Sequence, residues 1–195
     1  MMVMGNFRRG NSWGRSPYWL GRSTAPALLV SILIFSAFVG AFAETAKPAY
    51  PGLPNCHLVA PGIYRGAAPT AEGFTTLQSL GVRTIIDLRI EKAAKAEQQT
   101  AQKLGFVWIS LRMGREAPTQ QQVDTLLGHL AKAPEAPVYV HCQHGADRTG
   151  CMIGIYRVQV EGWSFAQAWE EMRRYGFKPY LNELKAAVRS RAKTE

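Results

Sequence analysis

Cys142 and Arg148 are a nucleophile and an anion-binding side chain separated by five residues. They follow the apolar run 138–141 and precede a helix-like stretch. A loop of this size can turn successive backbone N–H groups toward a tetrahedral anion, and the following helix adds free N–H groups and a positive dipole end. Gly145 supplies the backbone freedom that such a curved loop requires. The segment therefore predicts a binding site for an anion such as a phosphate group.

Each residue of this segment has an expected role. Thiols at helix N-termini beside arginine lose their proton more readily than free cysteine, so we expect Cys142 to be a thiolate at neutral pH. Its attack on phosphorus would give a phosphocysteine, which water hydrolyses in a second step. Arg148 can hold two phosphate oxygens, Thr149 can hydrogen-bond the sulfur as it leaves, and His141 is either an ordering residue for the loop or a structural histidine. The expected phosphate-binding residues are Gln143, His144, Gly145, Ala146, Asp147 and Arg148.

The run His141-Cys142-x5-Arg148-Thr149 resembles the signature of the cysteine-dependent protein tyrosine phosphatases, in their compact dual-specificity branch. The segments 62–66 (GIYRG) and 84–89 (TIIDLR) extend the resemblance to exported bacterial members of that branch. The resemblance implies hydrolysis of phosphate monoesters without a cofactor, with a phosphotyrosine protein as the favoured substrate. No metal is expected, because the neighbouring His141 and Cys142 cannot converge on one zinc ion and no second ligand pair follows.

The resemblance also implies an aspartate on an upstream loop that protonates the leaving oxygen, and here the sequence departs from the family pattern. The loop 112–118 carries Glu116 as its only acid. Glu116 can serve as the general acid, or it can be an acid placed before a helix N-terminus for electrostatic benefit. Asp124 is a more remote candidate, because it falls within a helical stretch.

The elements around these residues predict an α/β domain with a central, mostly parallel sheet of four or five strands flanked by helices, the compact dual-specificity phosphatase type. Short apolar runs predict strands, and helices are predicted where an N-terminal cap precedes an apolar face with helical spacing. The expected strands are residues 62–66, 82–88, 106–111 and 138–141. The expected helices begin after Thr70, at Glu91, after Thr119, at Thr149, after Ser164 and near Leu181.

Residues 1–43 have the three parts of a secretory signal peptide: a basic flank, an uncharged apolar stretch and an Ala-x-Ala end at Ala43. An uncleaved N-terminal anchor is the alternative, and it would be the chain's contact with a membrane. We expect residues 44–61, which contain four prolines, to form an extended leader, and residues 62–195 to form the phosphatase domain. Either alternative places the domain in the periplasm or another exported location.

The 195 residues are 47% hydrophobic and 19% charged, which suits one folded domain and excludes a disordered chain. The net charge of +9 includes four arginines in residues 1–43, and no run of five basic residues supports nucleic-acid binding. Three cysteines are too few for a disulfide framework. Two alternatives to a tyrosine phosphatase stay open: a phosphatase for a lipid or small-molecule phosphate, and a catalytically weak module that binds phosphorylated partners.

Overall fold

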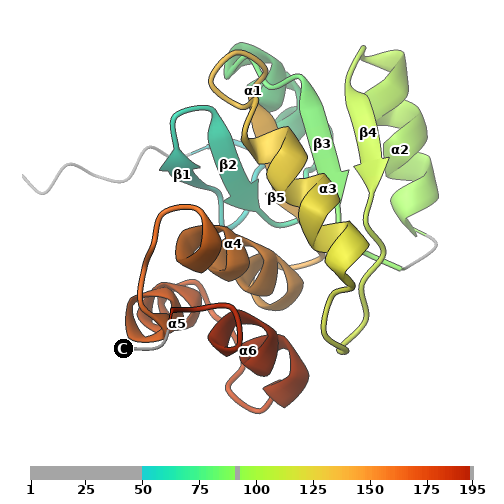
Figure 1. Cartoon of the computed structure of the whole chain (residues 1–195). Coiled ribbons are helices and arrows are strands. Elements are labelled where there is room, and N and C mark those ends of the chain that lie inside the picture. The colour runs from blue at the N-terminus through green and yellow to red at the C-terminus, as the bar shows by residue number, and fades with distance from the viewer. Residues whose placement is uncertain (1–49, 91–92, 194–195) are drawn as a thin grey trace, which may run out of the picture. The chain divides into compact units, whose positions relative to one another are not determined.

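The computed structural model describes residues 50–90 and 93–193, and a five-stranded sheet forms the centre of this part of the chain (Figure 1). The strands lie in the order β1-β2-β5-β3-β4. The last four in this order run parallel to one another, whereas β1 pairs antiparallel with β2 at one edge. The strands are β1 His57–Ala60, β2 Ile63–Gly66, β3 Thr84–Asp87, β4 Val107–Ser110 and β5 Val138–His141.

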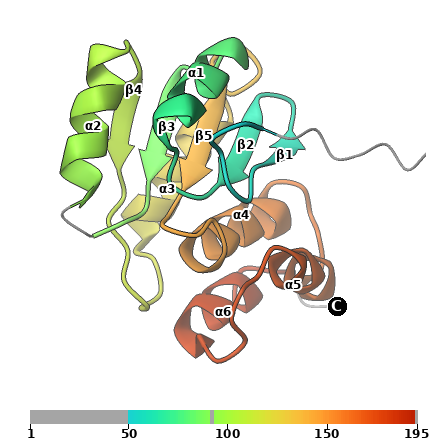
Figure 2. The ribbon, with the colours of Figure 1, turned by 180° about the vertical axis from the view of Figure 1, so that it is seen from behind.

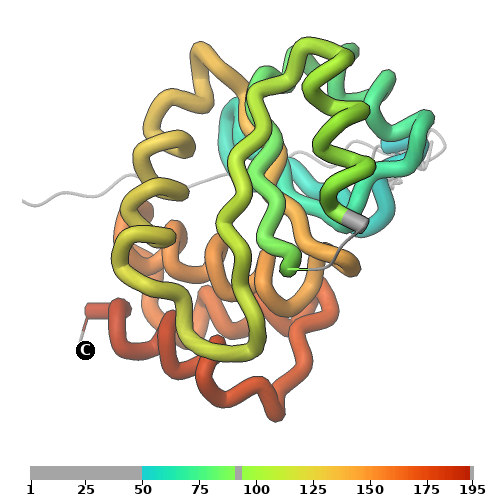
Figure 3. The backbone as a smooth tube through the Cα atoms, turned by 90° about the vertical axis from the view of Figure 1, so that its right-hand side faces the viewer, coloured from blue at the N-terminus to red at the C-terminus, as the bar shows by residue number. Residues whose placement is uncertain are grey.

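Helices cover both faces of the sheet (Figures 2 and 3). α1 and α2 lie on one face and α3 and α4 on the other, while α5 and α6 pack against α4. Because both faces are covered, β3 and β5 are buried along their whole length and consist largely of β-branched and aromatic residues. The helices are α1 Ala71–Ser79, α2 Ala93–Lys103, α3 Gln120–Leu130, α4 Asp147–Gln159, α5 Phe165–Arg174 and α6 Asn182–Arg189.

The two faces of the sheet form two separate hydrophobic clusters. Ile86 and Val140 belong to the cluster that includes residues of α3, α4, α5 and α6. The preceding residue in each strand, Ile85 or Tyr139, belongs to the cluster around Phe74 of α1. This alternation is the two-residue period of a β-strand, and it places the central strands between two layers of helices. The predicted α/β class and mostly parallel sheet are confirmed.

The carboxyl ends of β2, β3 and β5 meet at one edge of the sheet. Gly66 and Asp87 are both register partners of His141, which is the last residue of β5. The segments that follow these three strands therefore lie together, although they are far apart in the sequence. In open parallel sheets this edge is where ligands bind.

Local signals for helix starts are confirmed at three positions. Thr70 accepts a hydrogen bond from the backbone N–H of Gly73 at the start of α1. Thr119 and Ser164 each form a reciprocal capping box with the glutamine three residues later, at the starts of α3 and α5.

Two expected boundaries differ from the structure. Residues 57–60 fall in the segment expected to be an extended leader, but they form β1, because Pro54 and Pro61 flank this short strand without interrupting it. The helix expected from Thr149 begins at Asp147, so Arg148 lies in its first turn and not in the preceding loop. The expected helix start at Glu91 lies outside the described residues, and α2 is described from Ala93.

The expected signal segment, residues 1–43, and the first six residues of the expected leader also lie outside the described residues. Within the described ranges, the helices are too short or too polar to cross a lipid bilayer.

Candidate active site

Cys142 lies directly after β5, and its side chain is buried with 2% of its surface exposed. Residues 143–146 then curve into α4. Gly145 has a φ of +68°, and a Cβ atom at this position would lie 2.4 Å from the carbonyl carbon of Gly66. The expected need for glycine in the loop is thus explained both by its backbone conformation and by its close contact with β2.

Four successive carbonyl groups of the loop face hydrogen-bonding groups from other parts of the chain or from His141. In each case a polar nitrogen lies within hydrogen-bond distance of the oxygen. The pairs are Cys142 O with His141 Nδ1 (3.3 Å), Gln143 O with Ala68 N (3.4 Å), His144 O with Asn55 Nδ2 (3.1 Å) and Gly145 O with Arg65 Nη2 (2.8 Å).

These contacts determine where the amide groups of the loop point. In a trans peptide the C=O and N–H bonds point in opposite directions, so the N–H groups of residues 143–146 point away from the four anchors. N–H groups of a loop that are free to face a ligand just before a helix N-terminus can form an anion-binding arrangement. The contacts of the carbonyl groups are therefore compatible with phosphate binding at this loop.

Arg65 of β2 is, like His141, a fully buried anchor with none of its surface exposed. Its guanidinium group donates to Gly145 O, stacks on the ring of Tyr175 at 4.6 Å and lies 3.8 Å from the carboxylate of Glu171. Burial lowers the pKa of Arg65 to about 10, which leaves the side chain cationic at neutral pH. These contacts make Arg65 a structural support of the Cys142 loop.

Replacing Arg65 should destabilise the protein. Arg65→Met leaves the buried Gly145 carbonyl without its donor and removes one cation beside Glu171, so we expect a loss of about 3 kcal/mol in the free energy of unfolding. Urea unfolding followed by tryptophan fluorescence measures it. Arg83→Met, at an exposed arginine, is the matched control and should change stability by less than about 0.5 kcal/mol. Equal effects of the two substitutions would contradict this role for Arg65.

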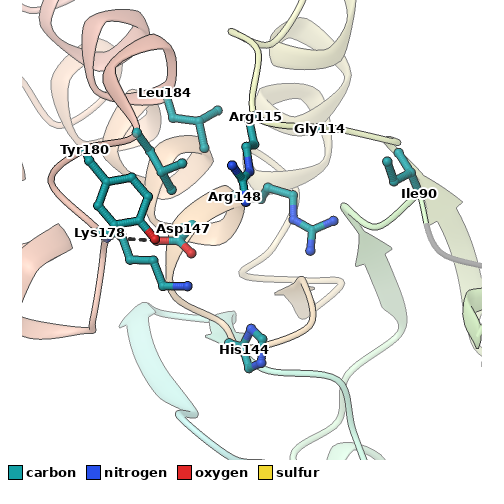
Figure 4. Close-up of a pocket in the computed structure, with 10 residues that line it drawn as sticks. Ile90, Gly114, Arg115, His144, Asp147, Arg148, Lys178, Tyr180 and Leu184 are labelled. Atoms are coloured by element: carbon teal, nitrogen blue, oxygen red, sulfur yellow. Dashed lines mark hydrogen bonds between the residues drawn. The ribbon is translucent and has the colours of Figure 1, made fainter.

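A pocket of about 290 Å³ opens at the start of α4 (Figure 4). Basic groups from three segments surround it, since Arg148 comes from α4, Arg115 from the loop after β4 and Lys178 from the segment between α5 and α6. Ile90, Tyr180 and Leu184 add apolar and aromatic surface. The full lining is Ile90, Gly114, Arg115, His144, Asp147, Arg148, Lys178, Tyr180, Leu181 and Leu184. The excess of cations suits an anionic ligand with an apolar part.

Asp147 lines this pocket, and a hydrogen bond fixes its carboxylate. Its Oδ1 accepts a hydrogen bond from the backbone N–H of Lys178 at 2.8 Å, drawn as the dashed line in Figure 4. Because an inward-pointing carboxylate would repel phosphate, the sequence predicts that Asp147 faces outward and either braces the loop or receives a neighbouring donor, and the N–H of Lys178 is such a donor. This contact ties the first turn of α4 to the segment between α5 and α6, which carries Tyr180 into the pocket lining.

Thr149 and His141 are both fully buried beside the loop. The hydroxyl of Thr149 has no hydrogen-bond partner among the described residues, so the expected bond to the Cys142 sulfur is not formed in this structure. The hydroxyl of Thr149 can therefore donate a hydrogen bond to negative charge that develops on the Cys142 sulfur during the reaction. His141 contacts the loop through Cys142 O, as expected of an ordering residue.

Glu116 is exposed and does not belong to the pocket lining, although its loop contributes Gly114 and Arg115. Its carboxylate folds back over its own loop, where a Cβ atom on Gly114 would lie 2.2 Å from Oε2. Asp124 lies on α3, where Gln120 donates to its carboxylate. Of the predicted site residues, His144, Asp147 and Arg148 line this pocket, whereas Cys142, Glu116 and Asp124 are not among its lining residues.

Sequence reasoning missed two contributors to this site. Asn55 has a φ of +51° and donates to both His144 O and Tyr175 O, linking the loop to the end of α5. The asparagine among prolines was a signal for a turn, but its partners are 89 and 120 residues away. The segment with Lys178 and Tyr180 had no recognisable signal.

A parallel sheet whose central strand ends in a Cys-x5-Arg loop is the architecture of the dual-specificity type of phosphatase. A family model described as a DSP-PTPase phosphatase fused to NAD+ kinase matches residues 59–190. The dual specificity protein phosphatase TpbA of Pseudomonas aeruginosa (strain UCBPP-PA14) is 32% identical in an alignment 161 positions long, which covers 74% of this chain and 72% of TpbA. The inositol diphosphatase DSP3 of Arabidopsis thaliana is 30% identical in an alignment 125 positions long, which covers 62% of this chain and 61% of DSP3.

Solved structures agree with these matches. A crystal structure of TpbA has a TM-score of 0.62 and 30% identity, covering 74% of this chain and 89% of that chain. A structure of TpbA in complex with pTyr has a TM-score of 0.59 and 28% identity, covering 71% and 90%. The chain belongs to the DSP-PTPase phosphatase family, and it is a phosphatase.

Proposed function

We propose that this phosphatase hydrolyses phosphate monoesters through Cys142 and that a phosphotyrosine protein is its substrate. The sulfur attacks phosphorus and the bond to the leaving oxygen breaks, with a proton supplied to that oxygen by a general acid. Water then attacks the phosphocysteine, releasing inorganic phosphate and restoring the thiolate. Arg148 and the amides of residues 143–146 bind the phosphate oxygens in both steps. The observation that supports this proposal most directly is the loop 142–146. Four of its carbonyl groups face hydrogen-bonding nitrogens of other residues just before the N-terminus of α4.

Two observations support phosphotyrosine. Ile90, Tyr180 and Leu184 provide apolar surface in the pocket that contains Arg148, which suits an aromatic ring. The relative TpbA has been crystallised with pTyr. The second candidate substrate is an inositol pyrophosphate, because Arg115 and Lys178 can bind a further phosphate group beside Arg148 and because DSP3 is an inositol diphosphatase.

Four substrates distinguish these functions. We expect hydrolysis of para-nitrophenyl phosphate without added metal and without sensitivity to a chelator. We also expect a higher kcat/KM for a phosphotyrosine peptide than for the matching phosphoserine peptide or for an inositol pyrophosphate. Faster release of phosphate from the inositol pyrophosphate would establish the second candidate instead. Binding of the phosphotyrosine peptide without turnover would indicate the interaction module.

We propose Glu116 as the general acid, because the loop that carries it contributes Gly114 and Arg115 to the pocket. Its exposed position requires the loop to bring the carboxyl group inward when substrate binds, and catalytic contacts often tighten only in the complex. We expect Glu116→Gln to lower kcat by about 10² to 10⁴ for an aryl phosphate with a poor leaving group, and much less for one with a good leaving group. Asp124→Asn is the matched control and should change neither rate. Small, equal effects of Glu116→Gln on both substrates would dismiss Glu116.

The proposed location is the periplasm or another exported compartment, on the evidence of residues 1–43. Sequencing the N-terminus of the protein recovered from a periplasmic extract tests this. A mature start at residue 44 supports a cleaved signal peptide, and recovery from the cytoplasm with Met1 intact would contradict export.

A further inference from the structure

Four titratable or charged side chains form a buried cluster behind the Cys142 loop: Asp87, Arg89, Glu97 and His141. None of these four lines the pocket. Arg89 Nε donates to Asp87 Oδ1 at 2.8 Å, and Arg89 Nη2 donates to Glu97 Oε2 at 2.7 Å. The other oxygen of Glu97, Oε1, lies 3.3 Å from His141 Nε2. Glu97 comes from α2, and it was not singled out from the sequence, so the cluster connects an outer helix with the residue that precedes Cys142.

The tautomer of His141 follows from its two contacts. Nδ1 lies 3.3 Å from Cys142 O, and a carbonyl oxygen can only accept, so Nδ1 carries a hydrogen. Burial lowers the pKa of His141 to about 4, so the ring is neutral at physiological pH. A neutral imidazole has one N–H group, and Nε2 is therefore an acceptor with a free lone pair. The nearest group to that lone pair is the Glu97 carboxyl, with Oε1 at 3.3 Å, and Asp87 Oδ1 lies farther away at 3.9 Å.

Nε2 and Glu97 Oε1 are both buried, and neither is satisfied by a hydrogen bond to another group in the described part of the chain. If Glu97 were ionised, two acceptors would face each other at 3.3 Å. A proton on Oε1 converts this contact into a donor and an acceptor. Burial raises the pKa of Glu97 to about 7, with Arg89 opposing the rise, so the carboxyl group holds its proton through the acidic and near-neutral range.

We propose that Glu97 is a positioning residue: its protonated carboxyl group donates to His141 Nε2, which keeps His141 Nδ1 donating to the carbonyl of Cys142, and ionisation of Glu97 lowers the activity. This inference rests on the proposed role of Cys142 in catalysis. It adds a pH-dependent control of that site from α2.

Two effects follow when Glu97 loses its proton. First, the lone pair of Nε2 meets a carboxylate, which favours moving the ring hydrogen from Nδ1 to Nε2 and so breaks the contact with Cys142 O. Second, the cluster gains an uncompensated negative charge, because Asp87 already balances Arg89. That charge opposes both a thiolate at Cys142 and a bound phosphate. The groups facing the Glu97–His141 pair are Asp87 of β3, Arg89 after it, Tyr139 of β5, Cys142 and Arg148 of α4.

The sign of the pH dependence is fixed by these contacts. Below about pH 7 Glu97 is protonated, so that His141 Nδ1 keeps its hydrogen bond to the carbonyl of Cys142. Above about pH 7 Glu97 ionises. With an aryl phosphate that has a good leaving group, and so needs no general acid, kcat/KM of the parent should therefore fall as pH rises through this range.

Glu97→Gln tests the proposal, because the glutamine amide can donate to Nε2 while its oxygen accepts from Arg89, and it has no proton to lose. We expect kcat/KM within about threefold of the parent at pH 6, and a ratio of variant to parent that rises about fivefold or more by pH 8.5. Glu97→Ala should have about a tenth of the kcat/KM of Glu97→Gln at every pH, because Nε2 is left without a donor. Glu135→Gln, at an exposed carboxylate, is the matched control and should follow the parent.

A pH profile of kcat/KM for Glu97→Gln that parallels that of the parent, or a uniform loss of kcat/KM in this variant, would overturn the proposal while leaving the phosphatase function intact.

A second measurement does not depend on activity: ¹⁵N spectra of the His141 ring at pH 6 should show a protonated Nδ1 and an unprotonated Nε2. The other histidines, His57, His129 and His144, are identified by replacing each in turn with glutamine. A hydrogen on His141 Nε2 at pH 6 would refute the proposed hydrogen bond from the Glu97 carboxyl group to Nε2. Absence of hydrolysis in the parent would instead refute the proposed function, and the spectra would still decide the tautomer.

Discussion

Cys142→Ser should lower kcat for para-nitrophenyl phosphate by about 10⁴-fold or more, because a serine hydroxyl is not ionised at neutral pH and cannot replace a thiolate as nucleophile. The substitution changes one buried atom at the end of β5, and the anchors of the loop are backbone contacts to residues 142–145. The anion site should therefore persist. We expect the variant to bind a phosphotyrosine peptide, as measured by isothermal titration calorimetry, while failing to release phosphate from it.

Cys56→Ser is the matched control for Cys142→Ser. Cys56 is also buried, but it packs with Leu53 and Phe74 on the other face of the sheet, so its loss should change kcat by less than about twofold. Circular dichroism of both variants establishes that they are folded. Retained hydrolysis in a folded Cys142→Ser protein would remove the proposed nucleophile.

Arg148→Lys should lower kcat by about 10² to 10³, although the charge is conserved. The guanidinium group offers parallel donors that match two phosphate oxygens, and an ammonium group offers a point charge that cannot contact both in the same geometry. The side chain starts in the first turn of α4 and lines the pocket, and in the proposed mechanism it binds the phosphate oxygens on which charge develops. Steady-state kinetics with para-nitrophenyl phosphate measures the loss.

Arg115→Lys provides the comparison for Arg148→Lys. Arg115 lines the same pocket but lies on an exposed loop, so its replacement should raise KM without a comparable loss of kcat. If Arg148→Lys also changed KM alone, Arg148 would contribute to substrate binding and not to stabilising the transition state.

Part of this protein could be predicted because its signals are local. Apolar runs predicted β3, β4 and β5, and pairs of residues three apart predicted the capping boxes at Thr119 and Ser164, since a capping box forms between near neighbours in sequence. The spacing of Cys142 and Arg148, with Gly145 between them, likewise indicated a curved loop before a helix. These features determine the α/β class and the kind of chemistry that the loop can support.

The tertiary structure alone decided what surrounds that loop. Asn55 and Arg65 hold its carbonyls from positions 89 and 80 residues earlier in the chain, and Glu97 reaches His141 from a helix whose sequence shows no special pattern. The position of Glu116 outside the pocket was also not predictable, because the path of an exposed loop depends on packing more than on residue type. Contacts of this kind depend on which strand ends the topology brings together, and here β2, β3 and β5 end at one edge, so distant segments meet around Cys142.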